Sequence, residues 1–539
     1  MAKYFLGLDC STQSLTGILI DFHSHSIVYK ESIIFDEELP HYNTQNGVYI
    51  SDGGKVVHSN QLMWVDALEL FFKRLQKTKF LLKDIKAISG SGQQHGTVYV
   101  NEKFEESLIN LNLDRSISSQ LKNAFSRQTS PIWMDSSTTK QCEEIRNALG
   151  GKEATIRLTG SDSFERFSGP QIRKFYQEEP EHYFSTSKIH LVSSFLSSIL
   201  LGKNSPIDHG DGAGMNLMNI KTKQWDDSAL EATAPDLKQK LPLLTHSYDI
   251  IGKISPYFVQ RYNFSQDTIL LPWSGDNPNS LIGVGLIGKG KAAISLGTSD
   301  TYFSYMKNLY LDLKGEGHVF VAPTGDYMSL ICYKNGSLAR ERIKGNLTWD
   351  NFSEILERTS PGNNGKIILP YFFPEIVPPV LNPKVFRFGF DENDIEGNIR
   401  AIIEAQFLSM RLHSEWIKEK PNEIYATGGG SVNNKILQVA SDIFGTIIRH
   451  FNITNSAALG AALRGAKSFH DYIGDKKSWS QIVMSFLDAQ ESTLIEPNKN
   501  SKRLYNDMLN LYRKYEDYIV RNGENPEIYR HSFIKRYFK

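Results

Sequence analysis

One stretch of the 539-residue chain places a carboxylate close to a turn of small hydroxyl side chains. Asp276 lies between Gly275 and Asn277, and a short Gly-punctuated apolar segment separates it from Leu296-Gly297-Thr298-Ser299. A carboxylate can accept a proton, and a turn rich in hydroxyls and backbone N–H groups can hold phosphate. Taken alone, Asp276 could also be a helix N-cap. We expect the chemistry of this protein to be done in this stretch.

A second hydroxyl-rich turn follows the first strand-like segment. Residues 4–9 are apolar up to Asp9, Ser11-Thr12-Gln13-Ser14 forms a turn, and residues 15–21 are apolar again. The same order of strand, turn and strand recurs around Thr298. An ordinary hairpin loop explains the first turn by itself. Two such turns at similar points of two halves indicate an internally duplicated fold that binds phosphate.

Two further polar tracts could bind the hydroxyl groups of a ligand. Gln93-Gln94-His95 lies between glycines, where the backbone can turn sharply, and its side chains both donate and accept hydrogen bonds. A structural histidine satisfied by backbone is an equal alternative. Arg166 lies in an aromatic and charged loop, where it could donate to a ligand or form a surface ion pair with Glu165. The ion pair is the default for an isolated arginine.

A third tract pairs Trp133 with Asp135 before a polar helix expected over residues 138–149. An aromatic ring beside a carboxylate is a common sugar-binding pair, but a buried tryptophan and an aspartate that caps the helix explain the same residues. An apolar helix is expected over residues 189–201, and residues 208–214 are expected to form a flexible loop. The acids of this loop lack the spacing of a calcium site, so no metal site is predicted there.

A glycine-rich turn connects a strand expected over residues 423–426 to a helix that extends to Phe444. It contains Gly428, Gly429 and Asn433, and it allows a flat or anionic ligand to approach the backbone. It is neither a Walker P-loop nor a dinucleotide-binding fingerprint. Residues 455–462 begin a helix of small residues that could pack very closely on a neighbour.

Composition and charge exclude several classes of protein. Lys+Arg and Asp+Glu both total 60, so no global field favours nucleic acid or an acidic membrane. The three cysteines are far apart, which favours a reducing compartment and argues against a structural zinc site. No apolar run approaches the roughly 20 residues that span a bilayer, and the first residues lack the basic and apolar pattern of a leader, so none is expected. We expect a soluble, cytoplasmic protein of at least two domains.

Five tracts in this order resemble the FGGY carbohydrate kinases, which are members of the actin-like ATPase superfamily. The resemblance covers residues 4–465. Within the family, Glu-Arg-Phe-Ser-Gly and Asp-Gly-Ala-Gly-Met-Asn-Leu are most similar to the branch that phosphorylates D-xylulose, and ribulose, glycerol or gluconate are the alternatives. Many members place an arginine where this chain has Ser137, so no sugar contact is carried over to that tract. The matching tracts are Gly7-Leu8-Asp9-Cys10-Ser11-Thr12-Gln13-Ser14, Gly92-Gln93-Gln94-His95-Gly96, Ser274-Gly275-Asp276-Asn277, Ser295-Leu296-Gly297-Thr298-Ser299-Asp300 and Ala426-Thr427-Gly428-Gly429.

The resemblance implies an α/β fold of two ribonuclease-H-like domains flanking a catalytic cleft. We expect a sugar-binding domain over residues 1–278, a nucleotide-binding domain over 279–468 and a charged helical extension, 469–539, packed on the second domain. Asp276 would be the general base for transfer of the γ-phosphate of ATP, and Asp9 would hold Mg²⁺ through water. The residues implied for the sugar are His95, Arg166, Asp276 and Asn277, and those for ATP are Asp9, Ser11, Thr12, Thr298, Trp349, Gly428, Gly429 and Asn433.

The expected partners are a small sugar and ATP, with no nucleic acid and no membrane, and the chain is expected to be a monomer or a homodimer. An actin-like or chaperone-like ATPase that drives conformational work is a different class of function. It would leave the Gln-Gln-His tract and Arg166 without a task. A sugar sensor that has lost catalysis is disfavoured, because both Asp9 and Asp276 are present.

Overall fold

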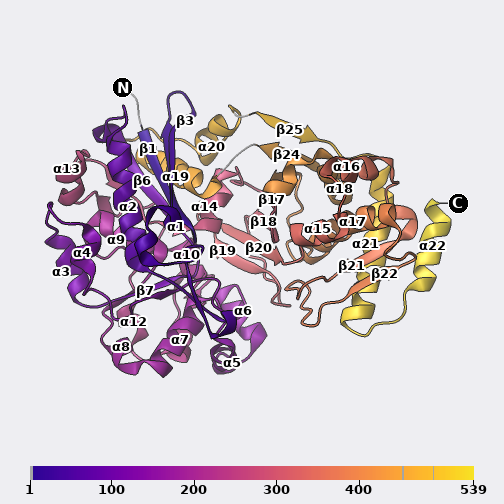
Figure 1. The fold of residues 1–539 in the computed structure, drawn as a ribbon, viewed down its shortest axis with the longest axis horizontal. Coiled ribbons are helices and arrows are strands. Elements are labelled where there is room, and N and C mark those ends of the chain that lie inside the picture. Colours follow the sequence, from indigo (N-terminus) through magenta and orange to yellow (C-terminus); the bar gives the residue numbers. More distant parts are fainter. Residues whose placement is uncertain (1–3, 452–454, 490, 539) are drawn as a thin grey trace. The chain divides into compact units, whose positions relative to one another are not determined.

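The computed structural model describes residues 4–451, 455–489 and 491–538, which form two compact units (Figure 1). The first unit contains residues 4–287, 319–328 and 455–489, and the second contains residues 288–318, 329–451 and 491–538. Each unit is therefore assembled from segments far apart in the sequence. This differs from the contiguous division at 278/279 and 468/469, since residues 469–489 lie in the first unit and only 491–538 in the second.

The sheet of the first unit is built on the expected N-terminal meander. Its first three strands pair antiparallel with their neighbours in sequence, whereas β6, β15 and β16 extend the sheet in parallel from β1. Because parallel strands end at the same edge, the residues that follow β1, β6 and β16 are brought together there. In spatial order the strands are β14 (Gly252–Lys253), β15 (Ile269–Leu270), β6 (Ile85–Gly92), β1 (Tyr4–Cys10), β2 (Ser14–Asp21) and β3 (Ser26–Ile34), with β16 (Ser274–Gly275) paired to β6.

The sheet of the second unit repeats this strand order. An antiparallel hairpin, β17 with β18, lies in the middle, and β23 and then β24 follow in parallel from β17. The order β20-β18-β17-β23-β24 corresponds to β3-β2-β1-β6-β15 of the first unit, which confirms the internal duplication predicted from the two turns. The strands are β20 (Tyr327–Tyr333), β18 (Asp300–Met306), β17 (Lys291–Leu296), β23 (Glu423–Thr427), β24 (Ile447–Phe451) and the antiparallel edge strand β25 (Ser492–Ile495).

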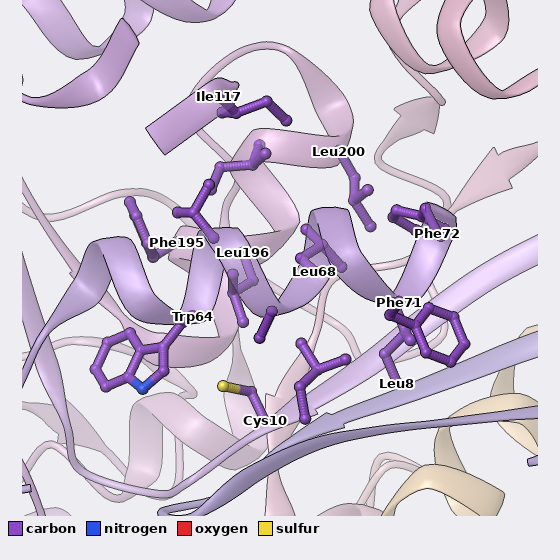
Figure 2. Close-up of a cluster of buried hydrophobic side chains, with 14 of the residues drawn as sticks. Leu8, Cys10, Trp64, Leu68, Phe71, Phe72, Ile117, Phe195, Leu196 and Leu200 are labelled. Carbon is purple, nitrogen blue, oxygen red and sulfur yellow. The ribbon is translucent and has the colours of Figure 1, made fainter. Parts of the chain in front are cut away.

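The main core of the first unit lies between its sheet and helix α2 (Gln61–Gln76). Figure 2 shows side chains of α2 gathered with those of β1 and of α9 (Val192–Leu201). Each large apolar side chain buried in this way contributes about 1.5–3 kcal/mol relative to an exposed one. The residues labelled there are Leu8 and Cys10 of β1, Trp64, Leu68, Phe71 and Phe72 of α2, Ile117, and Phe195, Leu196 and Leu200 of α9.

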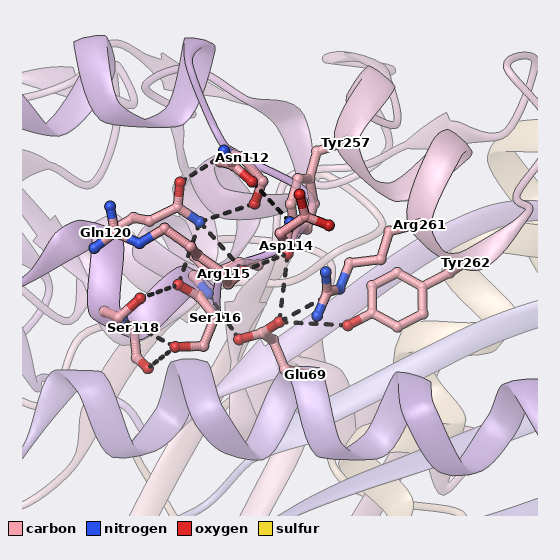
Figure 3. A network of polar contacts seen from close by, with 12 residues as sticks. Glu69, Asn112, Asp114, Arg115, Ser116, Ser118, Gln120, Tyr257, Arg261 and Tyr262 are labelled. Carbon is pink, nitrogen blue, oxygen red and sulfur yellow. Dashed lines mark hydrogen bonds and ion pairs between the residues drawn. The ribbon is translucent and has the colours of Figure 1, made fainter.

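A buried carboxylate, Glu69 of α2, joins this helix to two other segments (Figure 3). One oxygen accepts a hydrogen bond from the backbone N of Ile117 at 2.8 Å, at the start of α4 (Ile117–Leu121). The other accepts from the hydroxyls of Tyr257 and Tyr262 at 3.4 and 3.5 Å, on α13 (Pro256–Tyr262). Burial raises the pKa of Glu69. These contacts satisfy a polar group that would otherwise be costly inside the core.

Two segments differ from the sequence-based expectation. Residues 189–191 are part of strand β9 (Lys188–Leu191), which pairs with β7 (Thr97–Val100), so the apolar helix begins only at Val192. The flexible loop predicted over 208–214 is wrong. The short helix α10 (His209–Ala213) is buried there and is capped by Asp208, whose side chain accepts a hydrogen bond from the backbone N of Asp211 at 2.8 Å. Glycine content suggested exposure, but tertiary packing covers these small residues.

Helix α19 (Ser456–Tyr472) explains why a late segment of the chain belongs to the first unit. It packs on β1, on β6 and on α14 (Asp276–Gly283), and Figure 1 shows it beside the strands. A Cβ at Gly460 would lie 1.9 Å from the backbone oxygen of Asn279, and one at Gly7 would lie 2.0 Å from that of Ala458. The close packing predicted for this small-residue helix is therefore confirmed.

We expect Gly460→Ala to lower the melting temperature, although alanine favours helix by about 1 kcal/mol. The added methyl collides with backbone, and overpacking of this kind costs typically 1–3 kcal/mol, or more where backbone cannot move, as here. Gly465→Ala in the same helix is the matched control, because its Cβ would lie 3.4 Å from that of Ala87, an ordinary contact. Thermal unfolding followed by circular dichroism compares the two variants. Equal melting temperatures would contradict the packing argument.

A further helix lies where the sequence predicted one. The helix expected over residues 138–149 corresponds to α5. Among residues 4–451, 455–489 and 491–538, no helix combines the length and the apolar character needed to cross a bilayer. The helices that are used in the sections below, with their bounds, are α5 (Thr139–Ala148), α7 (Ser168–Glu178), α15 (Ser337–Lys344), α16 (Trp349–Arg358), α17 (Ile395–His413), α18 (Asn434–Phe444), α20 (Trp479–Leu487), α21 (Ser501–Val520) and α22 (Glu527–Tyr537).

Candidate functional site

Asp9 lies near the carboxyl end of β1 and is only 8% exposed. Its Oδ2 accepts a hydrogen bond from Ser11 Oγ at 2.6 Å, whereas its buried Oδ1 has no partner in the described part of the chain. Burial raises the pKa of Asp9, and the hydrogen bond from Ser11 opposes the rise. A buried carboxylate oxygen without a donor is costly. Asp9 Oδ1 is therefore placed to accept a donor that a ligand brings.

The turn after β1 is a tight hairpin, as expected. Ser11 N donates to the backbone oxygen of Ser14 at 2.9 Å. Thr12 Oγ1 donates to Gln93 Oε1 at 3.3 Å and accepts a hydrogen bond from Trp133 Nε1 at 2.9 Å. The Thr12 hydroxyl is thus held between the turn that follows β6 and a residue 121 positions away.

The tract around Trp133 matches neither interpretation drawn from the sequence. Trp133 is 46% exposed, so it is not a buried tryptophan, and its ring nitrogen bonds Thr12. Asp135 is buried and does not cap α5, whose N-cap is Thr138. The carboxylate of Asp135 has its oxygens occupied by internal donors and has a structural role. Those donors are Val57 N, Ser137 N, Ser137 Oγ and Gln171 Nε2.

Asp276 is the first residue of α14, at the same edge of the sheet as Asp9. The N-cap of the helix is Gly275, so the alternative that Asp276 is an N-cap is wrong. Asp276 Oδ1 accepts hydrogen bonds from the backbone N and from Nδ2 of Asn277, at 2.9 and 3.0 Å. Burial, and then the charge of Asp9, raise the pKa of Asp276 from 3.8 to about 7. A carboxyl group that titrates near neutral pH suits proton transfer at that pH.

His95 lies in the same unit and has the left-handed backbone conformation, with φ of 75°. Its Nδ1 donates to the backbone oxygen of Gly214 at 2.8 Å. Burial, and then the charge of Arg166, lower the pKa of His95 to about 3, so the ring is neutral. Because Nδ1 carries the proton, Nε2 is an acceptor. The histidine has a backbone partner, as its structural interpretation required, and still has an acceptor for a ligand hydroxyl.

The remaining predicted sugar residues surround His95 and Asp276. Asn277 Nδ2 donates to Gln94 Oε1 at 2.8 Å, which joins the start of α14 to the Gln-Gln-His tract. The guanidinium of Arg166 lies over the rings of Phe164 and Phe167, 5.3 and 5.9 Å from their centroids. The structure therefore brings together all four residues implied for the sugar within the first unit.

Sequence reasoning missed Asp211, a carboxylate in the same region. Its Oδ1 and Gln94 Nε2 are buried and have no partner among the described residues. A Cβ at Gly275 would lie 3.0 Å from Asp211 Oδ1 and 3.0 Å from Gln94 Cγ, so both groups crowd the backbone just before Asp276. Burial raises the pKa of Asp211 well above its usual value. The Gln-Gln-His pattern pointed to Gln94, whereas Asp211 was hidden in a segment expected to be a loop.

The second unit contains a cavity of about 720 Å³, a size typical of ligand sites. Asn433 caps α18 by accepting hydrogen bonds from Lys435 N at 3.0 Å and Ile436 N at 3.3 Å. Gly428 does not line the cavity but precedes the lining residue Gly429. It has φ of 84°, and a Cβ there would be 2.7 Å from the backbone oxygen of Leu296. Four of the five nucleotide residues predicted in this unit line this one cavity: Thr298, Trp349, Gly429 and Asn433.

A buried ion pair supports the Thr298 turn. The guanidinium of Arg340 contacts both oxygens of Asp300 at 2.6 and 2.9 Å, and both side chains are 1% exposed. Arg340 also lines the cavity. Burial raises the pKa of Asp300, and the charge of Arg340 opposes this rise. Since Asp300 opens β18 directly after the turn, the pair fixes the end of the turn against α15.

The chain matches two sequence models of one family along most of its length. The FGGY family of carbohydrate kinases, N-terminal domain, matches residues 4–283, and the C-terminal domain of the same family matches residues 292–469. The chain belongs to this family. It is therefore a carbohydrate kinase, an enzyme that uses ATP to phosphorylate a small-molecule substrate. This confirms the family that the ordered tracts indicated.

Named relatives match this FGGY kinase over nearly its whole length. A protein of Arabidopsis thaliana named Xylulose kinase 2 is 45% identical over 497 residues, which cover 88% of each chain. A Xylulose kinase of Rattus norvegicus is 39% identical over 535 residues and covers 97% of this chain and 98% of its own length. The similarity is thus not confined to the glycine turns.

Solved structures confirm the predicted fold class. A xylulose kinase from Rhodospirillum rubrum superposes with a TM-score of 0.81 at 16% identity, covering 99% of this chain and 100% of its own. A gluconate kinase from Lactobacillus acidophilus gives a TM-score of 0.80 at 20% identity, covering 96% and 98%. At such identities the likeness concerns the fold alone, which is the two-domain α/β fold of actin-like ATPases.

Proposed function

We propose that this kinase transfers the γ-phosphate of ATP to the terminal hydroxyl of D-xylulose, giving D-xylulose 5-phosphate. The acceptor is supported by the xylulose kinases to which the chain is 39–45% identical over at least 88% of its length. The observation that carries the catalytic proposal is Asp276, a carboxyl group with its pKa near 7 that lies among side chains suited to hydroxyl groups.

Asp276 is proposed as the general base. It accepts the proton of the attacking hydroxyl while the sugar oxygen bonds the γ-phosphorus and the bond from phosphorus to the β-phosphate oxygen breaks. The two donors of Asn277 hold the carboxylate in one orientation. His95 Nε2 accepts from one sugar hydroxyl, and Arg166 donates to a sugar oxygen. These residues position the acceptor, which is most of what phosphoryl transfer requires.

The cavity of the second unit is proposed to bind the nucleoside of ATP. Trp349 is 39% exposed and lines the cavity, so its ring can cover the adenine ring of ATP. Gly428 and Gly429 keep the backbone accessible to a flat ligand. The hydroxyls and turn N–H groups of Ser11 and Thr12 in the first unit, and of Thr298 in the second, are proposed to bind phosphate.

Asp9 fits a magnesium ion held through water, because its buried Oδ1 lacks a donor within the described residues. No three His, Cys, Asp or Glu side chains in residues 4–451, 455–489 and 491–538 are arranged to bind a metal ion together. Mg²⁺ suits such a sparse site, since it keeps several waters and uses few carboxylates. When bound, Mg²⁺ neutralises charge on the phosphates. Asp9 would accept a hydrogen bond from a metal-bound water.

A coupled assay of ADP release against a panel of acceptors tests the function. We expect D-xylulose to give the highest kcat/KM among D-xylulose, D-ribulose, glycerol and gluconate. A higher value for another acceptor would assign a different sugar kinase activity. ADP release that no acceptor stimulates would favour the actin-like or chaperone-like alternative. The cytoplasmic location and the monomeric or dimeric state stay predictions.

The pH dependence of turnover follows from the raised pKa of Asp276. Only the ionised carboxylate can accept a proton, so kcat/KM for the sugar is expected to rise with pH through about 7 and then level off. The titratable groups that interact with Asp276 are Asp9 on β1 and Asp211 on α10, and Arg166 acts on the neighbouring His95. Initial rates between pH 5.5 and 8.5, at saturating ATP, measure this profile. A flat profile would contradict the assignment of the base.

A further inference from the structure

A buried arginine on α19 holds the segment that carries Asp276. Arg464 is fully buried and makes three hydrogen bonds of 2.7 Å. Its Nη1 donates to Asn279 Oδ1, and its Nη2 donates to the backbone oxygens of Ser247 and Pro272. Pro272 precedes Asp276 by four residues and Asn279 follows it by three. One guanidinium therefore holds both sides of the proposed base.

Asn279 extends this hold to the backbone next to Asp276. Its Nδ2 donates to the backbone oxygen of Gly275 at 3.0 Å and to that of Gly90, on β6, at 3.1 Å. Ser274 is fixed separately, because its Oγ donates to Asp208 Oδ1 at 2.6 Å. The two residues before Asp276 are thus tied to α10 and, through Asn279, to α19.

Burial of the Arg464 guanidinium lowers the stability of the folded protein. Within the part of the chain that the structure describes, Arg464 forms no ion pair with a carboxylate, and its buried Nε has no partner. Its three partners are neutral oxygens. Burial lowers the pKa of Arg464 to about 10, with the charge of Asp208 opposing. A buried charge that lacks a bonded counter-charge usually costs more than an apolar side chain of the same size. A role in packing alone does not account for an arginine at this position.

We propose that Arg464 is a positioning residue for catalysis, which fixes the start of α14 so that the Asp276 carboxylate meets the sugar hydroxyl. This inference rests on the proposed function, because it needs Asp276 to be the base. Displacement of a reacting group by about 1 Å can cost on the order of 100-fold in rate. Arg464 contacts neither sugar nor ATP in this role and acts through Asn279 and Pro272.

The test compares kcat, both KM values and the pH profile of Arg464→Met, Arg464→Lys and Asn279→Ala with the unsubstituted enzyme. We expect Arg464→Met to lower kcat about 10- to 100-fold, to leave the KM for ATP within about twofold, and to move the midpoint of the pH profile away from 7. Arg464→Lys should recover part of kcat, because its ammonium can still donate to two of the three oxygens.

Arg400 provides a matched control in the second unit. It is also a buried arginine, bonded to Glu404 at 2.7 Å and to the Tyr505 hydroxyl at 2.6 Å. Arg400→Met should lower the melting temperature and leave kcat per folded molecule and the pH midpoint unchanged. A change of midpoint in this control equal to that in Arg464→Met would overturn the inference.

If Arg464→Met does not fold, Asn279→Ala tests the positioning role instead. It removes the hydrogen bonds to Gly275 and Gly90 and leaves two hydrogen bonds of Arg464 intact. Folded variants with unchanged kcat and pH midpoint would overturn the inference. Loss of folding in both would do the same, because the residues would then serve folding and not positioning. Asp276→Asn separates the two proposals: if it keeps full turnover, the base assignment fails, and if it alone loses turnover, only the role of Arg464 fails.

Discussion

Replacement of Asp276 by asparagine is expected to lower kcat by roughly 10²–10⁴, the usual contribution of a positioned general base. Asparagine has nearly the same shape, so the fold and the KM for the sugar should change little. The amide cannot accept the proton of the sugar hydroxyl. The substitution should therefore slow phosphoryl transfer and leave substrate binding unchanged. Steady-state kinetics with D-xylulose and single-turnover ADP formation measure the loss. Turnover close to that of the unsubstituted enzyme would remove Asp276 from the mechanism.

The same variant carries a stability signature that a misfolded protein would not show. The pKa of Asp276 is raised in the folded state, so the ionised carboxylate destabilises the fold above pH 7, and this penalty fades as pH falls toward 4. Asp276→Asn should therefore unfold at a higher temperature than the unsubstituted enzyme at pH 8 and at the same temperature near pH 4. A shift from 3.8 to about 7 corresponds to roughly 4 kcal/mol, and the partial exposure of the side chain makes the gain smaller.

Replacement of Arg340 by methionine is expected to give the second large effect, a loss of about 3–5 kcal/mol in the stability of the second unit. Methionine fills similar space but leaves the buried carboxylate of Asp300 without its counter-charge. Because Arg340 also lines the 720 Å³ cavity, ATP affinity should fall as well. Denaturant unfolding and a calorimetric titration with ATP measure the two effects.

The double variant Arg340→Met with Asp300→Asn is the control for this prediction. It removes both charges, so it should recover part of the lost stability. In the single variant, the pKa of Asp300 rises further, and the folded state takes up a proton as pH falls. The stability deficit of Arg340→Met should therefore be smaller at pH 5 than at pH 8. A deficit independent of pH and of Asp300 would show that the pair does not support the turn.

Much of the candidate site could be predicted because its residues lie in short local patterns. Hydroxyl-rich turns after strands and the glycine turn before α18 depend on neighbours within a few positions, and the second unit gathers Thr298 and Asn433 at one cavity. The strand–turn–strand hairpin in each sheet was also predicted, because apolar segments flank each turn. The family resemblance, not the spacing of the residues, assigned their roles.

What the sequence missed depends on contacts between distant segments. Trp133 bonds Thr12 across 121 positions, and no local pattern indicates this. The segment around Asp211 has the glycines of a loop, yet β10 (Ile207–Asp208) and α10 form there because surrounding elements bury it. Residues 469–489 look like part of a charged appendage, but they continue from α19, whose small residues allow it to lie against β1 and α14.

The late return of α19 to the first unit has a consequence during synthesis of the protein. Asp276 leaves the ribosome 188 residues before Arg464, a delay of roughly 10–40 s at 5–20 residues per second. Throughout this interval the nascent chain contains Asp276 and α14 without the helix that packs against α14. We therefore expect ribosome-bound chains that end before residue 455 to lack kinase activity, and shortened versions of the first unit to need α19 supplied in order to fold.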